Sequence, residues 1–144
     1  MNNTTTTVST SDLHQNYVAA INSNDIDRIL ALISDDGVFQ LPGEPELLGK
    51  AAIQRWANDF FAEYEAHWDK TEHALEHSGD LAISRYTYTY TAQYRSRQDG
   101  SQIGEIGKGT CIYRCDPSGR WLLAIDSWST HEAPVDPGST SALP

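Results

Sequence analysis

The sequence predicts one α+β domain in which three N-terminal helices precede a meander of long antiparallel strands. Apolar residues recur at helical spacing as far as Tyr64, whereas beyond about residue 66 the alternation has a period of two. Strong turn signals separate the later segments, at residues 79–80, 99–100 and 116–119. The 144 residues suit one domain.

The three predicted helices begin at recognisable capping or turn residues. The first begins near residues 11–12, the second after Asn24, which can cap it, and the third at residues 49–50. Their apolar faces consist of Leu13, Tyr17, Ala20 and Ile21, then Ile26, Ile29, Leu30 and Ile33, then Ile53, Trp56, Ala57, Phe60 and Tyr64. These faces must cover one side of the sheet, because nothing else in the domain can bury them.

The predicted strands span residues 38–41, 66–76, 81–95, 107–115 and 121–130. A turn at residues 35–37 precedes the first of them, which ends at Pro42. The strand over 81–95 alternates most clearly. It places Tyr86, Tyr88 and Tyr90 on one face and Arg85, Thr87 and Thr89 on the other.

Composition excludes several classes of partner. The net charge is -10, which argues against nucleic acid and anionic membranes because both bind basic surfaces. No apolar run approaches the roughly 20 residues that span a bilayer, and the N-terminus lacks the features of a signal peptide. We therefore expect a cytoplasmic location, with Cys111 and Cys115 as reduced thiols. Residues 1–10 are predicted to be a disordered arm and residues 132–144 a flexible tail, which leaves the domain at 11–131.

Three stretches carry a resemblance to a known superfamily: QNYVAAINSNDIDRILALISDDGVFQLPG, LLGKAAIQRWANDFF and GRWLLAIDSW. They resemble the nuclear transport factor 2-like superfamily, which includes ketosteroid isomerases and SnoaL-like polyketide cyclases. The resemblance implies a cone-shaped, curved antiparallel sheet wrapped around three N-terminal helices, with a conical pocket between them. The superfamily also contains dehydratases, epoxide hydrolases and non-enzymatic binding proteins, so the resemblance leaves the reaction open.

The resemblance also implies candidate catalytic residues. Tyr17 falls where ketosteroid isomerases carry their oxyanion-hole tyrosine, but Leu41 and Cys111 occupy the positions of their two acids, so the same isomerisation is not expected. Asp126, in AIDSW, falls where limonene-epoxide-hydrolase-like proteins carry an aspartate. Arg85 falls at their arginine, and a threonine replaces their second aspartate.

Asp126 is the principal candidate for acid–base chemistry. A carboxylate in an apolar strand is costly to bury unless it is paired or hydrogen-bonded. It could move a proton, or it could form a purely structural pair with Arg85, and the sequence leaves both interpretations open. The resemblance also places His67, together with Asp69, Thr71 and His73, on the inward face of its strand, where His67 could shuttle protons or serve as a wall residue.

The remaining expectations concern the ligand and the partner. The predicted substrate-binding residues are Trp56, Phe60, Phe39, Leu41, Thr87, Thr89, Cys111, Tyr113 and Trp128. The face formed by Tyr86, Tyr88 and Tyr90 is expected to point outward and to form a homodimer interface. No metal site is predicted, because His67 and His73 are about 20 Å apart along a strand, and no cofactor signature such as a glycine-rich phosphate loop occurs.

These observations lead to three functional hypotheses. In the first, a cofactor-independent acid–base enzyme of the cyclase, isomerase or dehydratase type binds a small, largely apolar molecule that bears carbonyl or hydroxyl groups, with catalysis by Asp126, Arg85, His67 and Tyr17. In the second, the protein is a non-catalytic dimeric ligand-binding or association module. The third is epoxide hydrolysis, which would need a second carboxylate near Asp126, and Asp69 is the available candidate.

Overall fold

The computed structural model describes residues 12–131, and the predicted arm and tail lie outside these described residues. Three helices come first: α1 (Leu13–Asn22), α2 (Ile26–Leu30) and α3 (Lys50–Glu63). Asp25 rather than Asn24 caps α2, because its side chain accepts a hydrogen bond from the amide of Asp27 while Asn24 adopts a positive φ of 57°. None of these helices is long and apolar enough to cross a membrane.

Six strands form one sheet: β1 (Ile33–Gln40), β2 (Leu47–Leu48), β3 (Tyr64–Ser78), β4 (Leu81–Tyr94), β5 (Gln102–Cys115) and β6 (Trp121–His131). Their order is β2-β1-β6-β5-β4-β3. The meander from β3 to β6 is antiparallel as predicted, but β1 pairs with β6 in parallel, so the sheet is mixed. The turn predicted at residues 35–37 is wrong, because these residues lie inside β1. There the register of pairing with β6 shifts between Ile33 and Val38, as it does at a β-bulge.

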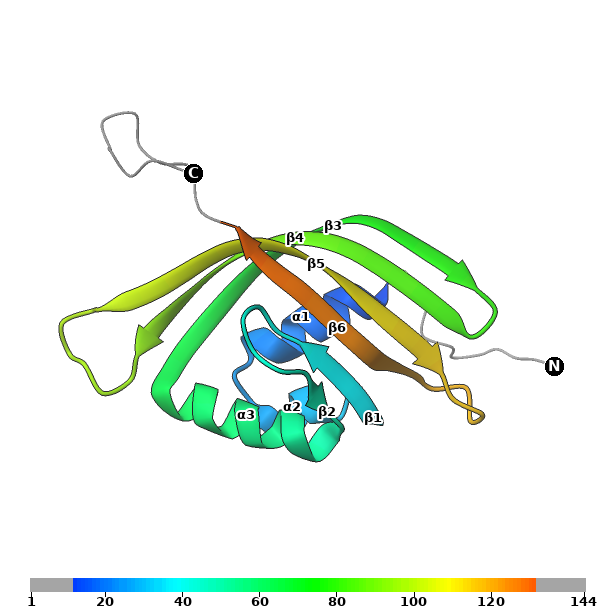
Figure 1. Cartoon of the computed structure of the whole chain (residues 1–144), viewed down its shortest axis with the longest axis horizontal. Coiled ribbons are helices and arrows are strands. Elements are labelled where there is room, and N and C mark those ends of the chain that lie inside the picture. Colours follow the sequence, from blue (N-terminus) through cyan, green and yellow to red (C-terminus); the bar gives the residue numbers. More distant parts are fainter. Residues whose placement is uncertain (1–11, 132–144) are drawn as a thin grey trace.

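The sheet curves around the helices, which lie against its concave side (Figure 1). This arrangement corrects the predicted faces of β4. Tyr86 and Tyr88 are almost fully buried on the concave face, whereas Arg85, Thr87 and Thr89 are exposed on the convex face. The reason is that an antiparallel strand with one solvated side directs its apolar side chains toward the core and its polar ones outward. A dimer through the three tyrosines is therefore incompatible with this fold.

Two glycines of β5 make room for the buried tyrosine rings. Gly109 lies opposite Tyr86 in the sheet, and Gly107 lies opposite Tyr88. A Cβ at residue 109 would lie 2.4 Å from the Tyr86 hydroxyl, and one at residue 107 would lie 2.6 Å from the Tyr88 hydroxyl. Because neither glycine has a side chain, each ring can lie across β5. Tyr86 thereby reaches β6.

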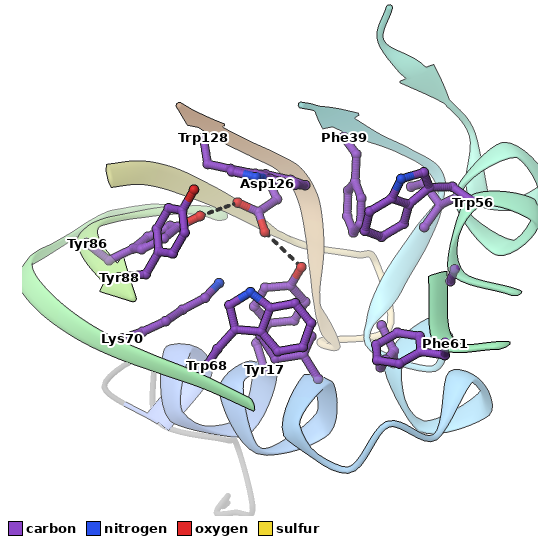
Figure 2. Close-up of a pocket in the computed structure, with 14 residues that line it drawn as sticks. Tyr17, Phe39, Trp56, Phe61, Trp68, Lys70, Tyr86, Tyr88, Asp126 and Trp128 are labelled. Carbon is purple, nitrogen blue, oxygen red and sulfur yellow. Dashed lines mark hydrogen bonds between the residues drawn. The ribbon is translucent and has the colours of Figure 1, made fainter. Parts of the chain in front are cut away.

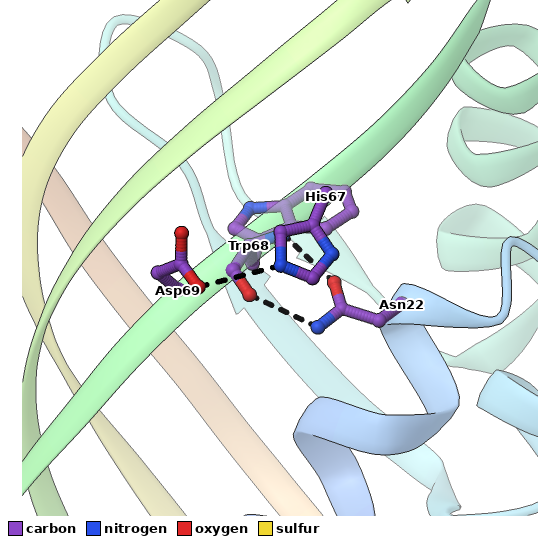
Figure 3. A network of polar contacts seen from close by, with 4 residues as sticks. All are labelled: Asn22, His67, Trp68 and Asp69. Atoms are coloured by element: carbon purple, nitrogen blue, oxygen red, sulfur yellow. Dashed lines mark hydrogen bonds and ion pairs between the residues drawn. The ribbon is translucent and has the colours of Figure 1, made fainter.

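Two asparagines attach the helices to the outer edge of the sheet. The Asn22 amide donates to the carbonyl of Trp68 at 2.9 Å and accepts from its N–H at 2.7 Å (Figure 3). Asn24 makes the same pair of bonds to Ala66. These side chains take the place of a neighbouring strand, so part of the β3 edge is satisfied and α1 is fixed over the concave face.

Candidate functional site

The candidate site is centred on Asp126, in β6, which is 3% exposed at the wall of an aromatic cavity. Its two carboxylate oxygens each accept a hydrogen bond from a tyrosine: Oδ2 from Tyr17 in α1 and Oδ1 from Tyr86 in β4, both at 2.8 Å (Figure 2). Burial raises the pKa of both phenols, and the nearby carboxylate raises it further. Both tyrosines therefore remain protonated at neutral pH and act as donors to Asp126.

Lys70, in β3, brings a positive charge close to the two tyrosines of this group. Its ammonium lies 4.3 Å from the centre of the Tyr86 ring and 5.1 Å from that of Tyr17, and the side chain lines the same cavity (Figure 2). It makes no ion pair with Asp126 within 4.0 Å. Lys70 is thus held over the faces of the two tyrosines that orient the carboxylate. It could approach a ligand oxygen without first breaking a salt bridge.

The cavity beside Asp126 is small and mostly apolar, and we call it the inner chamber. Its volume is about 50 Å³, enough for a few water molecules. Apart from the polar residues already described, it is lined by Ile21, Ile29, Phe39, Ile53, Trp56, Ala57, Phe61, Trp68, Tyr88 and Trp128. A larger ligand must displace some of these side chains.

A second cavity of about 170 Å³, the outer chamber, adjoins the first. Trp56, Trp68 and Trp128 line both chambers, so they lie between them. The outer chamber is completed by Leu41, Pro42, Glu44, Phe60, Tyr90 and Glu105. Polar groups therefore lie in the inner chamber, two carboxylates lie in the outer chamber, and aromatic rings line both.

A further buried polar residue, His14, lies close to the site. Its ring is 5.3 Å from that of Tyr86, and among residues 12–131 neither ring nitrogen has a hydrogen-bond partner. Burial lowers the pKa of His14, and the positive charge of Lys70 lowers it further. His14 is therefore neutral at physiological pH.

Arg85, Thr87, Thr89 and His67 do not enter the site, and their predicted inward placement is wrong. All four are exposed on the convex face. His67 contacts Asp69 at 3.3 Å on that face (Figure 3). Arg85 therefore cannot be the structural partner of Asp126. The epoxide hydrolase hypothesis fails for the same reason, since both Arg85 and Asp69 point away from the cavity.

The other predicted residues divide between the two chambers and the core. Trp56, Phe39 and Trp128 line the inner chamber, and Phe60 and Leu41 line the outer one. Cys111 and Tyr113 are buried but line neither chamber. Burial raises the pKa of the Cys111 thiol, which makes it a poor nucleophile.

Sequence reasoning missed Lys70, Tyr86, Tyr88 and Glu105 as site residues. Two signals could have identified the buried face of β4. Ala82 and Ala92 share the alternation of Tyr86, whereas the opposite register is polar at every position from Arg85 to Gln93. Opposite the tyrosines, β5 has glycine at alternate positions, which is the pattern expected where large rings cross a neighbouring strand.

Metal-binding geometry is absent from residues 12–131, where no three His, Cys, Asp or Glu side chains gather closely enough to hold an ion. His73 instead contacts the Thr87 hydroxyl at 2.8 Å, and His77 contacts the Gly79 carbonyl at 2.9 Å.

Comparison with known proteins identifies the class to which this fold and cavity belong. Residues 14–123 match the SnoaL-like domain family, and the chain belongs to that family. It shares the nuclear transport factor 2-like fold, as the resemblance implied. None of the curated proteins is similar enough to this sequence to count as a match.

Solved structures share the architecture at low sequence identity. A ketosteroid isomerase-like protein from Erwinia carotovora atroseptica superimposes with a TM-score of 0.75 at 22% identity, covering 85% of this chain and 94% of the other. A protein of the NTF2-like family from Streptomyces avermitilis, provisionally described as a dehydratase, gives 0.75 at 19% identity with the same coverage. One from Novosphingobium aromaticivorans, provisionally described as an aromatic ring hydroxylase, gives 0.70 at 22%, covering 85% and 87%. At these identities the likeness establishes the fold alone.

Proposed function

We propose that the protein is a cofactor-independent acid–base enzyme in which Asp126 moves a proton on a small, largely apolar ligand bearing a carbonyl or hydroxyl group. One observation carries the proposal: a buried carboxylate faces an aromatic cavity and has no cation within ion-pairing distance among residues 12–131. Burying such a group costs several kcal/mol. The two phenols offset part of that cost and fix the orientation of the carboxylate toward the cavity.

The geometry supports proton abstraction next to a carbonyl group. Each carboxylate oxygen accepts one phenolic hydrogen bond and keeps further acceptor capacity, so Asp126 can take a proton from carbon. The electron pair of the broken C–H bond moves to the ligand oxygen and forms an enolate, which the Lys70 ammonium would stabilise. Returning the proton to another carbon gives isomerisation, whereas returning it to a departing hydroxyl group releases water and gives dehydration.

Proton abstraction can be tested without knowing the substrate. Small ketones such as cyclohexanone and 1-indanone would first be screened for binding by tryptophan fluorescence. Those that bind would be followed by NMR for exchange of their α-protons in D₂O. We expect exchange above the buffer rate and a reduction of about 10²–10⁴-fold in Asp126→Asn, the usual contribution of a general base.

Controls separate chemistry from folding. Glu76→Gln removes one carboxylate from the exposed convex side of β3 and should leave exchange unchanged. Lys70→Met should slow exchange without abolishing ketone binding, because it removes charge stabilisation and not the cavity. A folded Asp126→Asn variant with the wild-type exchange rate would refute the proposal, as would ketones that bind without exchange.

A non-catalytic binding module is the second candidate, and one observation favours it. Both oxygens of Asp126 are already hydrogen-bonded inside the protein, and the inner chamber is only about 50 Å³. In this alternative the Asp126–tyrosine network holds α1 to β4 and β6. Asp126→Asn would then change stability but would not change any ligand's rate of proton exchange.

A further inference from the structure

The outer chamber combines aromatic rings with a carboxylate in a way that the proposed proton transfer does not use. Five rings line it, those of Trp56, Phe60, Trp68, Tyr90 and Trp128, and two carboxylates, Glu44 and Glu105, complete its wall. We infer that the outer chamber binds a small organic cation, a quaternary ammonium or protonated amine head group. This inference does not rest on the chemistry at Asp126.

The rings form a continuous wall. Trp56 stacks on Phe60 with centroids 5.3 Å apart, and Phe60 lies 5.9 Å from Trp68. Trp68 in turn stacks on Tyr90 at 5.3 Å, and Trp128 lies 6.5 Å from Trp56. Aromatic faces carry negative electrostatic potential and attract cations, and tryptophan does so most strongly. Several rings around one cavity are the arrangement by which proteins recognise ammonium groups.

Glu105 supplies the opposite charge. It is half-buried on the concave face of β5, opposite Tyr90, and its Oε1 accepts the Tyr88 hydroxyl at 3.0 Å. The ion pairs among residues 12–131 are Lys50 with Asp35 and His67 with Asp69, so no basic side chain within 4.0 Å neutralises Glu105. The carboxylate is therefore positioned by a phenol but lacks a cationic partner.

Charge and size both favour a compact cation over a neutral apolar molecule. A neutral ligand would contact the rings but would leave Glu105 without a counter-ion, whereas a cation would satisfy both. The net charge of -10 adds long-range attraction for a positive ligand. At about 170 Å³ against about 50 Å³ for the inner chamber, the outer chamber has the room that a head group of a few heavy atoms needs.

The test compares two ligands of nearly identical shape, choline and its uncharged carbon analogue 3,3-dimethyl-1-butanol. Binding would be followed by tryptophan fluorescence and by calorimetry on the full chain. We expect choline to bind at least ten times more tightly than the alcohol. Glu105→Gln, which keeps an acceptor for Tyr88, should weaken choline binding about tenfold or more and leave the alcohol unaffected.

Matched variants locate the cation. Glu76→Gln removes the same charge from the opposite face and should leave the affinity for choline unchanged. Equal affinity for the two ligands, or no detectable choline binding, would overturn the proposal using the unaltered protein alone. A loss of choline binding in Asp126→Asn but not in Glu105→Gln would place the cation in the inner chamber and would also overturn it. If Glu76→Gln weakened choline binding as much as Glu105→Gln does, the effect would be due to net charge alone, and the proposal would be overturned.

Discussion

Gly109→Ala tests whether the glycine of β5 holds Tyr86 against Asp126. The added Cβ would lie 2.4 Å from the Tyr86 hydroxyl, 2.5 Å from its Cζ and 2.8 Å from the carbonyl of Ser127. Real Cβ contacts essentially never come within 3.0 Å, and the Tyr86 ring is 1% exposed and held in place by its hydrogen bond to Asp126. The ring or β6 must therefore shift.

The expected cost follows from two effects. Overpacking a dense core costs about 1–3 kcal/mol. A displaced Tyr86 would also lose its hydrogen bond to a carboxylate, which is typically worth about 1.5–3 kcal/mol. Replacing glycine by alanine in a strand recovers about 0.5–1 kcal/mol. We therefore expect the free energy of unfolding, measured by urea denaturation, to fall by about 1.5–5.5 kcal/mol.

Two comparisons make this prediction specific. Gly104→Ala lies on the same strand but is exposed, and its Cβ would approach the Tyr90 carbonyl only to 3.1 Å, so its cost should be below about 1 kcal/mol. In a Tyr86→Leu background, which removes the crowded ring atoms, the cost of Gly109→Ala should fall by at least half. Equal costs for the two glycines, or an unchanged cost in that background, would refute the reasoning.

Two further predictions concern pH. Burial lowers the pKa of His14, so its contribution to stability is present above the unfolded pKa of about 6.5 and is lost as the pH falls below that value. The urea midpoint of the wild-type protein should therefore decrease between pH 7 and pH 5. In His14→Phe the midpoint should depend less steeply on pH over the same range. Equal slopes of the urea midpoint against pH in the wild-type protein and the variant would contradict this prediction. Burial raises the pKa of Tyr90 to about 12 and raises those of Tyr17 and Tyr86 as well, so stability should fall as the pH rises from about 10 through 12. The absorbance of tyrosinate should then rise at a higher pH in the folded protein than in the urea-unfolded chain. If the two titration curves coincided, the buried placement of these tyrosines would be ruled out.

Much of the fold was predictable from local patterns. The helices at Leu13 and Lys50 begin within a residue or two of the predicted positions, and the turns at residues 79–80 and 116–119 separate the predicted strands. These features depend on near neighbours in sequence, through apolar periodicity and turn-forming residues. The parallel pairing of β1 with β6 was not predicted, because it joins residues more than 80 positions apart.

The sequence singled out two residues of the candidate site but not the residues that surround them. Asp126 and Tyr17 were both identified from the sequence, and they are hydrogen-bonded to each other at 2.8 Å. The predicted partner Arg85 is on the convex face, and its immediate neighbour Tyr86 makes the contact instead. The alternation of a strand shows which residues share a face, but it does not show which of the two faces the helices cover. If the wrong face is assigned to the core, every residue of the strand is placed on the wrong side of the sheet.

The sequence by itself determined an α+β domain with a carboxylate at residue 126 inside an apolar strand, because periodicity, turn signals and composition are local properties. Only the tertiary structure decided what surrounds that carboxylate. Tyr17, Tyr86 and Lys70 come from three separate elements, and they meet at Asp126 because the sheet curves over α1 and Gly109 leaves space for a ring to cross β5. Such convergence depends on curvature and close packing between distant segments, which no local pattern encodes.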